Sequence, residues 1–173
     1  GRADTLLHDF VSIDSISPHL ISAVIAAEDD DFYVHPGFDL PAILKAYEYN
    51  TARGRIVRGA STLTQQLAKN LFLSNEKTFG RKYRELCYTL LMEHFLGKKR
   101  ILELYLNYAQ WGKNIFGCEA ASRFYFKKPS GKLTQYEAAR LAAVLAMPAK
   151  LSPLNPDSYF MQQRIVMINP AAL

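Results

Sequence analysis

A run of four acidic residues, Glu28 to Asp31, ends an apolar helical pattern early in the chain. Ile21, Val24 and Ile25 recur at helical spacing, and continuing that spacing leads to Glu28. A carboxylate on an apolar stripe is partly desolvated, which raises its pKa and suits it to act as a general base near neutral pH. The three acids after it fall at a helix C-terminus, where the helix dipole disfavours negative charge. A frayed, solvated turn explains the last two acids well but Glu28 poorly, so both interpretations of Glu28 stay open.

A second group of polar side chains follows the turn at Ser61 and Thr62. Gly59 and this turn lead into a predicted helix, whose first N–H groups favour an anion. Residues four apart on a helix share a face, and two such pairs occur here: Gln65 with Lys69, and Gln66 with Asn70. One face therefore combines amide groups with a cation. A capped helix with a polar side would show the same pattern, so the spacing alone is only suggestive.

A third group is Arg81-Lys82-x-x-Glu85 at the start of a long predicted helix. Three or four residues separate each cation from Glu85, so an ordinary surface ion pair worth about 0.3–0.5 kcal/mol is the simplest interpretation. Glu93 differs, because it lies on the apolar stripe of Leu86 and Leu90. We expect it to be a buried, hydrogen-bonded carboxylate with a structural role.

Helix signals that could position these groups recur along nearly the whole chain. Ser17 and Pro18 suit an N-cap and the first helical position. Two pairs have capping-box spacing: Thr62 with Gln65, and Thr134 with Glu137. The predicted elements are a helix from Pro18, helices over 39–53, 62–72, 78–95, 100–108, 138–147 and 158–168, and extended segments from Phe10 to Ile13 and from Arg55 to Val57. Small residues in 138–147 place that helix in the core. The sequence predicts a mainly α fold with at most very short strands, in a single domain over residues 1–173.

The composition limits the possible classes of protein. The chain has 173 residues, of which 49% are apolar, enough for a domain with a hydrophobic core. Its net charge of +5 suggests an anionic partner, such as nucleic acid, phospholipid or a phosphorylated substrate. Cys87 and Cys118 lack metal-site spacing and are expected to be core thiols. No apolar run reaches the roughly 18 residues that span a bilayer.

Together these groups resemble the peptidoglycan glycosyltransferases of glycosyltransferase family 51. Four motifs in order carry the resemblance: Glu28-Asp29-x-x-Phe32-x-x-His35-x-Gly37; Gly59-x-Ser61-Thr62-x-x-Gln65-Gln66-x-x-Lys69-Asn70; Arg81-Lys82-x-x-Glu85 with Glu93; and Ile101-Leu102-x-x-Tyr105-Leu106-Asn107 with Gly112 and Gly117. The length is similar to that of members without a transpeptidase domain. The closing motif of the family has an arginine, but here Gln163 occupies the better register and Arg164 receives no role.

The resemblance implies a helical, lysozyme-like fold and inverting glycosyl transfer. The donor is the growing glycan on a lipid pyrophosphate, and the acceptor is the 4-hydroxyl of lipid II. Glu28 is then the general base, and Glu85 either orients cations or holds a divalent cation such as Mg²⁺, with no organic cofactor. The substrate-binding residues, which would contact the pyrophosphate, are Ser61, Thr62, Gln65, Gln66, Lys69, Asn70, Arg81 and Lys82. The family also binds the phosphoglycolipid moenomycin.

Two other classes of function remain as alternatives. A lysozyme-like hydrolase would use Glu28 and Glu85 as its carboxylate pair, but its leaving group carries no phosphate and needs no cations. A non-catalytic module could bind anionic lipid. Nucleic-acid binding is not expected, because no recognised motif is present.

The resemblance also predicts a location and partners. The domain would act on the outer face of the bacterial cytoplasmic membrane, with an N-terminal anchor preceding this sequence. Other cell-wall synthesis or division proteins could be partners. The segment from Phe38 to Val57 would touch the membrane surface, unless Leu40, Ile43, Leu44 and Tyr47 pack into the core.

Overall fold

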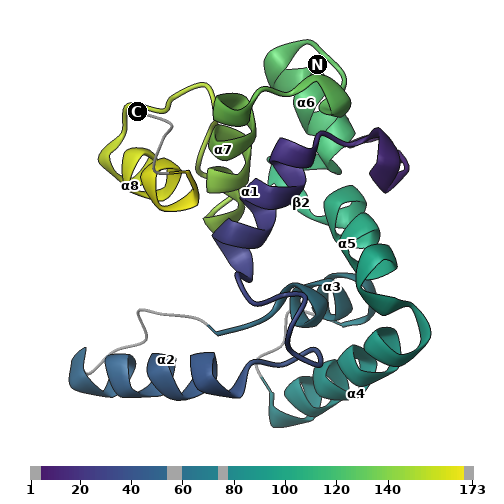
Figure 1. Ribbon diagram of the computed structural model, residues 1–173, viewed down its shortest axis with the longest axis vertical. Coiled ribbons are helices and arrows are strands. Elements are labelled where there is room, and N and C mark those ends of the chain that lie inside the picture. The colour runs from purple at the N-terminus through teal and green to yellow at the C-terminus, as the bar shows by residue number, and fades with distance from the viewer. Residues whose placement is uncertain (1–4, 54–59, 74–77, 170–173) are drawn as a thin grey trace. The chain divides into compact units, whose positions relative to one another are not determined.

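The computed structural model describes residues 5–53, 60–73 and 78–169 and is mainly helical (Figure 1). Its contacts divide the chain into two compact units. The first unit comprises residues 1–30 and 102–173, and the second comprises residues 31–101. The mainly α fold class is confirmed, whereas the single domain stays a prediction. Gly59, Arg55 and the rest of the predicted extended segment to Val57 lie outside the described residues.

The first unit combines helices with a small sheet. Its elements are β1 (Leu7–His8), η1 (Ile13–Ser15), α1 (Pro18–Glu28), β2 (Gln110–Gly112), β3 (Ile115–Phe116), α6 (Cys118–Phe126), η2 (Ser130–Lys132), α7 (Gln135–Ala143), η3 (Val144–Ala146) and α8 (Tyr159–Ile168). The strand order is β1-β3-β2, with β1 parallel and β2 antiparallel to β3. The unit boundary falls within α5 (Gly97–Tyr108).

Helix α7 forms the centre of the first unit, beside α1 and α8 (Figure 1). The small side chains of Ala138 and Ala142 are fully buried, which lets neighbouring helices approach closely. Leu20 and Val24 of α1 and Ile165 of α8 are buried with them, each such side chain contributing about 1.5–3 kcal/mol of hydrophobic free energy. The prediction that the alanine-rich helix lies in the core is confirmed.

The N-terminal segment is held to this core by Asn107 of α5. The side chain of Asn107 accepts a hydrogen bond from the N–H of Val11 and donates one to the Val11 carbonyl, each at 2.9 Å. Gly117 has φ +84°, and a Cβ there would lie 2.7 Å from the Asn107 carbonyl oxygen. This motif, which the sequence singled out without a role, therefore joins the N-terminal segment and the start of α6 to α5.

The second unit contains α2 (Leu40–Arg53), α3 (Leu63–Phe72) and α4 (Phe79–Phe95). Helices α3 and α4 pack together, with Leu63 and Leu67 fully buried and the ring of Phe72 stacked on that of Tyr88. Thr62 and Gln65 form the predicted capping box at the start of α3. Thr78 caps α4, because its side chain accepts a hydrogen bond from the N–H of Arg81.

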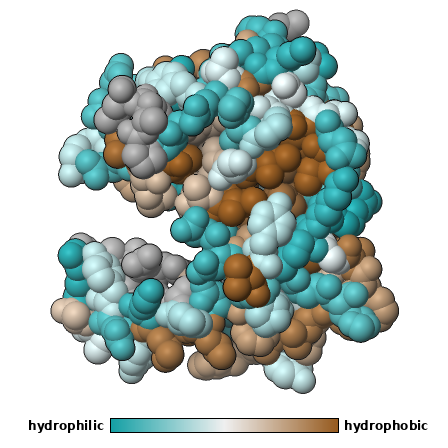
Figure 2. Space-filling view, in the orientation of Figure 1, coloured by the Kyte–Doolittle hydropathy of each residue, from teal (hydrophilic) through white to brown (hydrophobic). Residues whose placement is uncertain are grey.

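Helix α2 leaves its described large apolar side chains in solvent. Leu40, Ile43, Leu44 and Tyr47 are 59%, 39%, 62% and 70% exposed, so their packing into the core, the alternative kept open above, is wrong. Figure 2 shows apolar surface in the part of the view that contains α2 and α4. In the part of the chain that the structure describes, no helix combines the length and the apolarity needed to cross a membrane.

Three predicted boundaries differ from the structure. The prediction of an extended segment from Phe10 to Ile13 is wrong. The side chain of Ser12 accepts a hydrogen bond from the N–H of Asp14, and a 3-10 turn begins at Ile13. Helix α5 begins at Gly97 rather than at residue 100, since Gly97 takes φ +73° and allows an immediate restart after α4. Helix α7 ends at Ala143, and a 3-10 turn continues to Ala146.

Candidate active site

Glu28 is the last residue of α1, and its carboxylate meets a cation in the first unit. The Glu28 Oε1 accepts a hydrogen bond from Nη2 of Arg164 at 2.8 Å. The two side chains are only 13% and 18% exposed, so the pair is largely shielded from water. The solvated-turn interpretation therefore fails for Glu28, although Asp30 is exposed as that interpretation expects.

Arg164 lies on α8 and joins two helices of this unit. Its Nε donates to the carbonyl oxygen of Ala143 at the end of α7, at 3.0 Å, while Nη2 reaches Glu28. Gln163, which fitted the family register better, is exposed. The sequence does hold a signal for Arg164, because it follows the buried Met161 by three residues and precedes the buried Ile168 by four. A cation on the buried stripe of a helix needs an anionic or carbonyl partner.

Tyr105 of α5 belongs to the same cluster and was named by sequence only as part of a motif. Its side chain is buried, and burial is the main reason why its pKa lies well above the ordinary value of 10.0. The negative charge of Glu28 adds to this effect, whereas the positive charge of Arg164 opposes it. The hydroxyl group of Tyr105 therefore stays protonated near neutral pH and can donate a hydrogen bond.

In the second unit, Thr62 and Gln65 shape the N-terminus of α3. The Thr62 hydroxyl donates to the Gly37 carbonyl at 2.6 Å and accepts from the N–H of Gln65 at 3.2 Å. The Gln65 side-chain oxygen accepts from the N–H of Thr62 at 3.0 Å. The side chains of Thr62 and Gln65 therefore both form hydrogen bonds of the capping box, and these bonds fix the orientation of the first turn of α3.

The other predicted binding residues of α3 are more accessible. Ser61, Lys69 and Asn70 are exposed, and Gln66 is half-buried. Lys69 lies in the last turn of α3. A ligand on this helix could therefore meet the hydroxyl group of Ser61 and the ammonium group of Lys69 without displacing the capping box.

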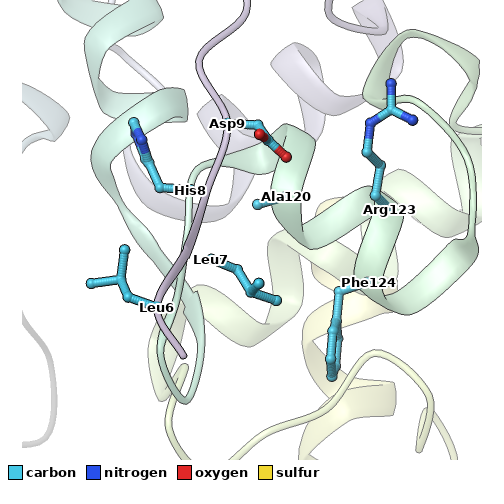
Figure 3. Close-up of a pocket in the computed structure, with 7 residues that line it drawn as sticks. All are labelled: Leu6, Leu7, His8, Asp9, Ala120, Arg123 and Phe124. Carbon is cyan, nitrogen blue, oxygen red and sulfur yellow. The ribbon is translucent and has the colours of Figure 1, made fainter. Parts of the chain in front are cut away.

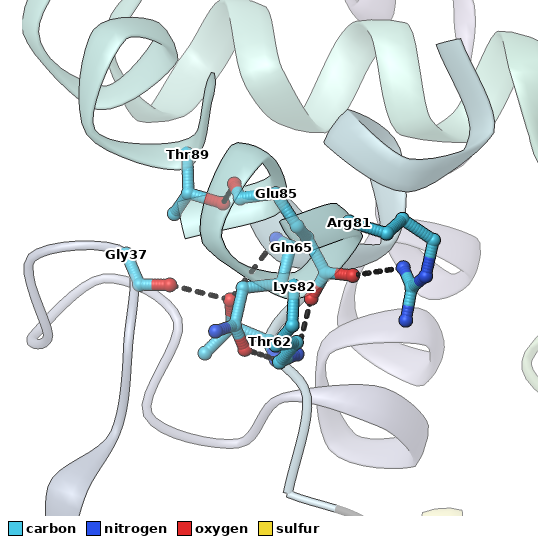
Figure 4. Close-up of polar contacts among 7 residues, drawn as sticks. All are labelled: Gly37, Thr62, Gln65, Arg81, Lys82, Glu85 and Thr89. Carbon is cyan, nitrogen blue, oxygen red and sulfur yellow. Dashed lines mark hydrogen bonds and ion pairs between the residues drawn. The ribbon is translucent and has the colours of Figure 1, made fainter. Parts of the chain in front are cut away.

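Glu85 pairs with two cations of its own helix in the second unit (Figure 4). Its Oε2 is 2.7 Å from Nη1 of Arg81, and its Oε1 is paired with Nζ of Lys82. Glu85 is only 3% exposed, so an ordinary surface ion pair is the wrong interpretation. One carboxylate holds two cations, which leaves a net positive charge on the group. The buried Nε of Arg81 has no hydrogen-bond partner among the described residues.

This arrangement suits one of the two roles considered for Glu85. Both of its oxygens are occupied by cations, which fits orientation of Arg81 and Lys82 and does not fit a metal ligand. Among residues 5–53, 60–73 and 78–169, no group of three or more His, Cys, Asp or Glu side chains could hold a metal ion. Binding of Mg²⁺ itself stays a prediction.

A pocket of about 370 Å³ in the first unit lies apart from the predicted residues (Figure 3). Residues of β1 and α6, including His8, Arg123 and Phe124, line it, and none of the predicted site residues does.

Glu119 of α6 accepts a hydrogen bond from Nε of Arg123 at 2.7 Å. Burial alone would raise the pKa of Glu119, but hydrogen bonds from Ser130 and the charge of Arg123 hold it below its ordinary value.

Comparison with known proteins identifies the family of this chain. Residues 3–171 match the transglycosylase family. Three relatives are each named biosynthetic peptidoglycan transglycosylase. The relative from Thiobacillus denitrificans is 48% identical over 97% of this chain and 72% of its own length. Those from Burkholderia cenocepacia and Cupriavidus pinatubonensis are 47% and 54% identical, over 92% and 80% of this chain. The chain spans 65% and 55% of the length of these two relatives. The chain belongs to the transglycosylase family.

Proposed function

We propose that this chain is the catalytic domain of a peptidoglycan glycosyltransferase that polymerises lipid II into glycan strands. The observation that carries the proposal is the buried carboxylate of Glu85 with Arg81 and Lys82 paired to it. Cations held in this way suit a pyrophosphate leaving group. A lysozyme-like hydrolase releases a sugar hydroxyl and has no use for them. The names of the relatives support the same reaction.

The reaction needs a general base, and Glu28 suits this role. The 4-hydroxyl oxygen of acceptor lipid II attacks the anomeric carbon of the donor sugar, and the bond from that carbon to the pyrophosphate oxygen breaks. Glu28 takes the hydroxyl proton during the attack. A single displacement inverts the anomeric centre, so an α-linked donor gives a β-linked glycan. Arg164, at 2.8 Å, favours the ionised carboxylate that can accept this proton.

The reaction also needs positive charge for the departing pyrophosphate. Arg81 and Lys82 supply it from α4, and Lys69 is the accessible cation of α3. The capped N-terminus of α3 adds oriented N–H groups that favour an anion. Glu85 keeps the two α4 cations in place. These groups are prearranged, so little reorganisation is needed as negative charge develops.

A divalent cation such as Mg²⁺ would add positive charge when bound to the substrate pyrophosphate. We place its ligands on the substrate, because both oxygens of Glu85 are engaged by Arg81 and Lys82. We propose no organic cofactor, and no step above passes through the metal.

We propose that the domain acts at the cell envelope, on the outer face of the bacterial cytoplasmic membrane. Lipid II carries a long polyprenyl chain, so the enzyme must work beside the bilayer. Helix α2 presents exposed Leu44 and Tyr47 beside exposed Lys45 and Arg53, a mixture that suits an interface with anionic headgroups. Other proteins of cell-wall synthesis or division are possible partners under this proposal.

Incubation with labelled lipid II, followed by separation of the products, tests the function. Glycan polymer supports the transferase, shortened glycan from preformed strands would indicate a hydrolase, and no turnover with retained lipid binding would indicate a binding module. Glu28→Gln should lower polymerisation by about 10²–10⁴ because the amide cannot accept the proton. Asp30→Asn, at an exposed acid of the same run, is the matched control and should keep the wild-type rate. A wild-type rate in Glu28→Gln would exclude Glu28 as the base.

A further inference from the structure

Lys98 has a position that the reaction above does not use. It lies in the first turn of α5, in the second unit, and its ammonium group contacts three partners there. It donates to the backbone carbonyl of His35 at 2.8 Å and to Oε1 of Glu93 at 2.9 Å. It also lies 4.6 Å from the ring centroid of Phe32. Two of these partners belong to the loop that follows the acidic run.

Glu93 links the same ammonium group to α3. Its Oε1 accepts from the hydroxyl of Thr64 at 2.6 Å as well as from Lys98. Glu93 also packs under Gly37, where a Cβ would come within 2.8 Å of the Glu93 Cγ. Gly37 has φ +103°, a conformation that favours glycine. The loop therefore rests directly on the Glu93 side chain.

The loop in turn touches the cap of α3. The Gly37 carbonyl accepts a hydrogen bond from the hydroxyl group of Thr62 at 2.6 Å, and Thr62 caps α3. Lys98 and Glu93 thus contact the loop of residues 32–37 at Phe32, His35 and Gly37, and Thr62 contacts it at the Gly37 carbonyl. A shift of the loop would change the orientation of the N–H groups at the start of α3.

We propose that Lys98 and Glu93 are positioning residues that fix the loop of residues 32–37 against the anion-facing N-terminus of α3. This inference rests on the proposed function, in which that helix end faces the substrate pyrophosphate. Charge on the pyrophosphate grows in the transition state, so the orientation of its donors affects kcat more than KM. Misplacement by about 1 Å can cost on the order of 100-fold in rate.

The polar character of this network favours positioning over simple packing. Partly buried ion pairs add little net stability compared with apolar residues of similar volume. Their hydrogen bonds are directional, however, and two different segments, the loop of residues 32–37 and helix α4, converge on the single ammonium group of Lys98. Such an arrangement specifies one loop geometry, which an apolar contact would not.

The test uses Lys98→Met, Lys98→Arg and Glu93→Gln in the whole chain, with Lys113→Met as the control at an exposed lysine. For each variant we would measure kcat and KM for lipid II, the thermal midpoint, and hydrogen exchange of the backbone amides. Glu93→Gln keeps an acceptor for Thr64 and most of the side-chain volume, so it remains informative if Lys98→Met folds poorly.

We expect kcat per folded enzyme to fall about ten- to 100-fold in Lys98→Met and Glu93→Gln, with KM changed less than about threefold. Exchange should rise in residues 32–37 and 62–65 but not in α6. Lys98→Arg, which keeps the charge, should recover most of kcat, and Lys113→Met should match the wild type. Wild-type kcat in both variants, or a loss accounted for by unfolding, would overturn the proposal. If the wild type makes no polymer, the proposed function fails. The positioning role is then judged by hydrogen exchange alone, and unchanged exchange of residues 32–37 and 62–65 in the Lys98→Met and Glu93→Gln variants would overturn it.

Discussion

Replacement of Arg164 by methionine tests the contact that sequence reasoning missed. The substitution removes the guanidinium group 2.8 Å from the Glu28 carboxylate and the hydrogen bond to the Ala143 carbonyl. Methionine keeps much of the side-chain length and fits an apolar stripe. Glu28 itself is unchanged, so the variant isolates the effect of the cation on the proposed base.

The structure allows the size of the effect to be worked out. Unit charges about 4 Å apart attract by about 4 kcal/mol at an effective dielectric constant of about 20. Water still reaches the pair, since the side chains are 13% and 18% exposed, and desolvation offsets part of the attraction. The attraction that remains favours the ionised form of the carboxylate.

The sign follows from the charge. Arg164 favours the ionised form, so its removal lets the base be protonated at higher pH. The acid limb of kcat/KM against pH should therefore move to higher pH in Arg164→Met. Well above that limb the base is ionised in both enzymes, and most of the wild-type rate should return if the cation mainly sets protonation.

The assay is lipid II polymerisation measured across pH, with thermal unfolding as a check on folding. We expect the midpoint to fall as well, because a largely buried carboxylate that loses a charged hydrogen-bond donor costs about 1–3 kcal/mol. Gln163→Met, at the exposed neighbour, is the control and should leave the profile unchanged. An unmoved acid limb in Arg164→Met, or an equal shift in Gln163→Met, would refute the reasoning.

Three further predictions concern other parts of the chain. Lys69→Ala and Arg81→Ala should each lower polymerisation by about 10²–10³ by removing charge from the leaving pyrophosphate, and normal turnover in both would remove these cations from the mechanism. The protein should bind vesicles that contain anionic lipid, and Tyr47→Ser in α2 should weaken that binding in a sedimentation assay; equal binding would exclude this contact. Because the folded state holds the pKa of Glu119 below its ordinary 4.5, this group adds stability above that value and loses it as pH falls. Urea unfolding from about pH 6 to pH 3 should show a flatter pH dependence in Ser130→Ala, and an unchanged slope would contradict the assignment.

Local features of the fold could be predicted from sequence because neighbouring residues determine them. The capping boxes at Thr62 and Thr134 need only residues three apart, and both occur as expected. The helical periodicity that places Glu28 on an apolar stripe is equally local. Boundaries that depend on a single backbone conformation were less predictable, as the restart of a helix at Gly97 shows.

Burial could not be predicted in the same way, because it depends on which helices pack together. The spacing of Arg81, Lys82 and Glu85 is identical in a surface pair and around a buried carboxylate, and only the packing of α4 on α3 decides between them. The apolar residues of α2 show the opposite error. Their helical stripe predicts core packing, yet in the second unit it remains exposed.

The pairing of Glu28 with Arg164 shows where sequence reasoning reaches its limit. The two residues are 136 positions apart, yet each is a charge on the buried stripe of its own helix. Periodicity indicates that Glu28 is partly desolvated, and the structure shows that both side chains are, so each needs a partner. Periodicity does not establish that they are partners of each other, because the first unit brings α1 and α8 together through α7. A register defined by apolar positions placed Gln163 first, whereas the requirement to neutralise a buried carboxylate selects Arg164. A desolvated charge is thus the more reliable guide to this site than the spacing of the apolar residues around it.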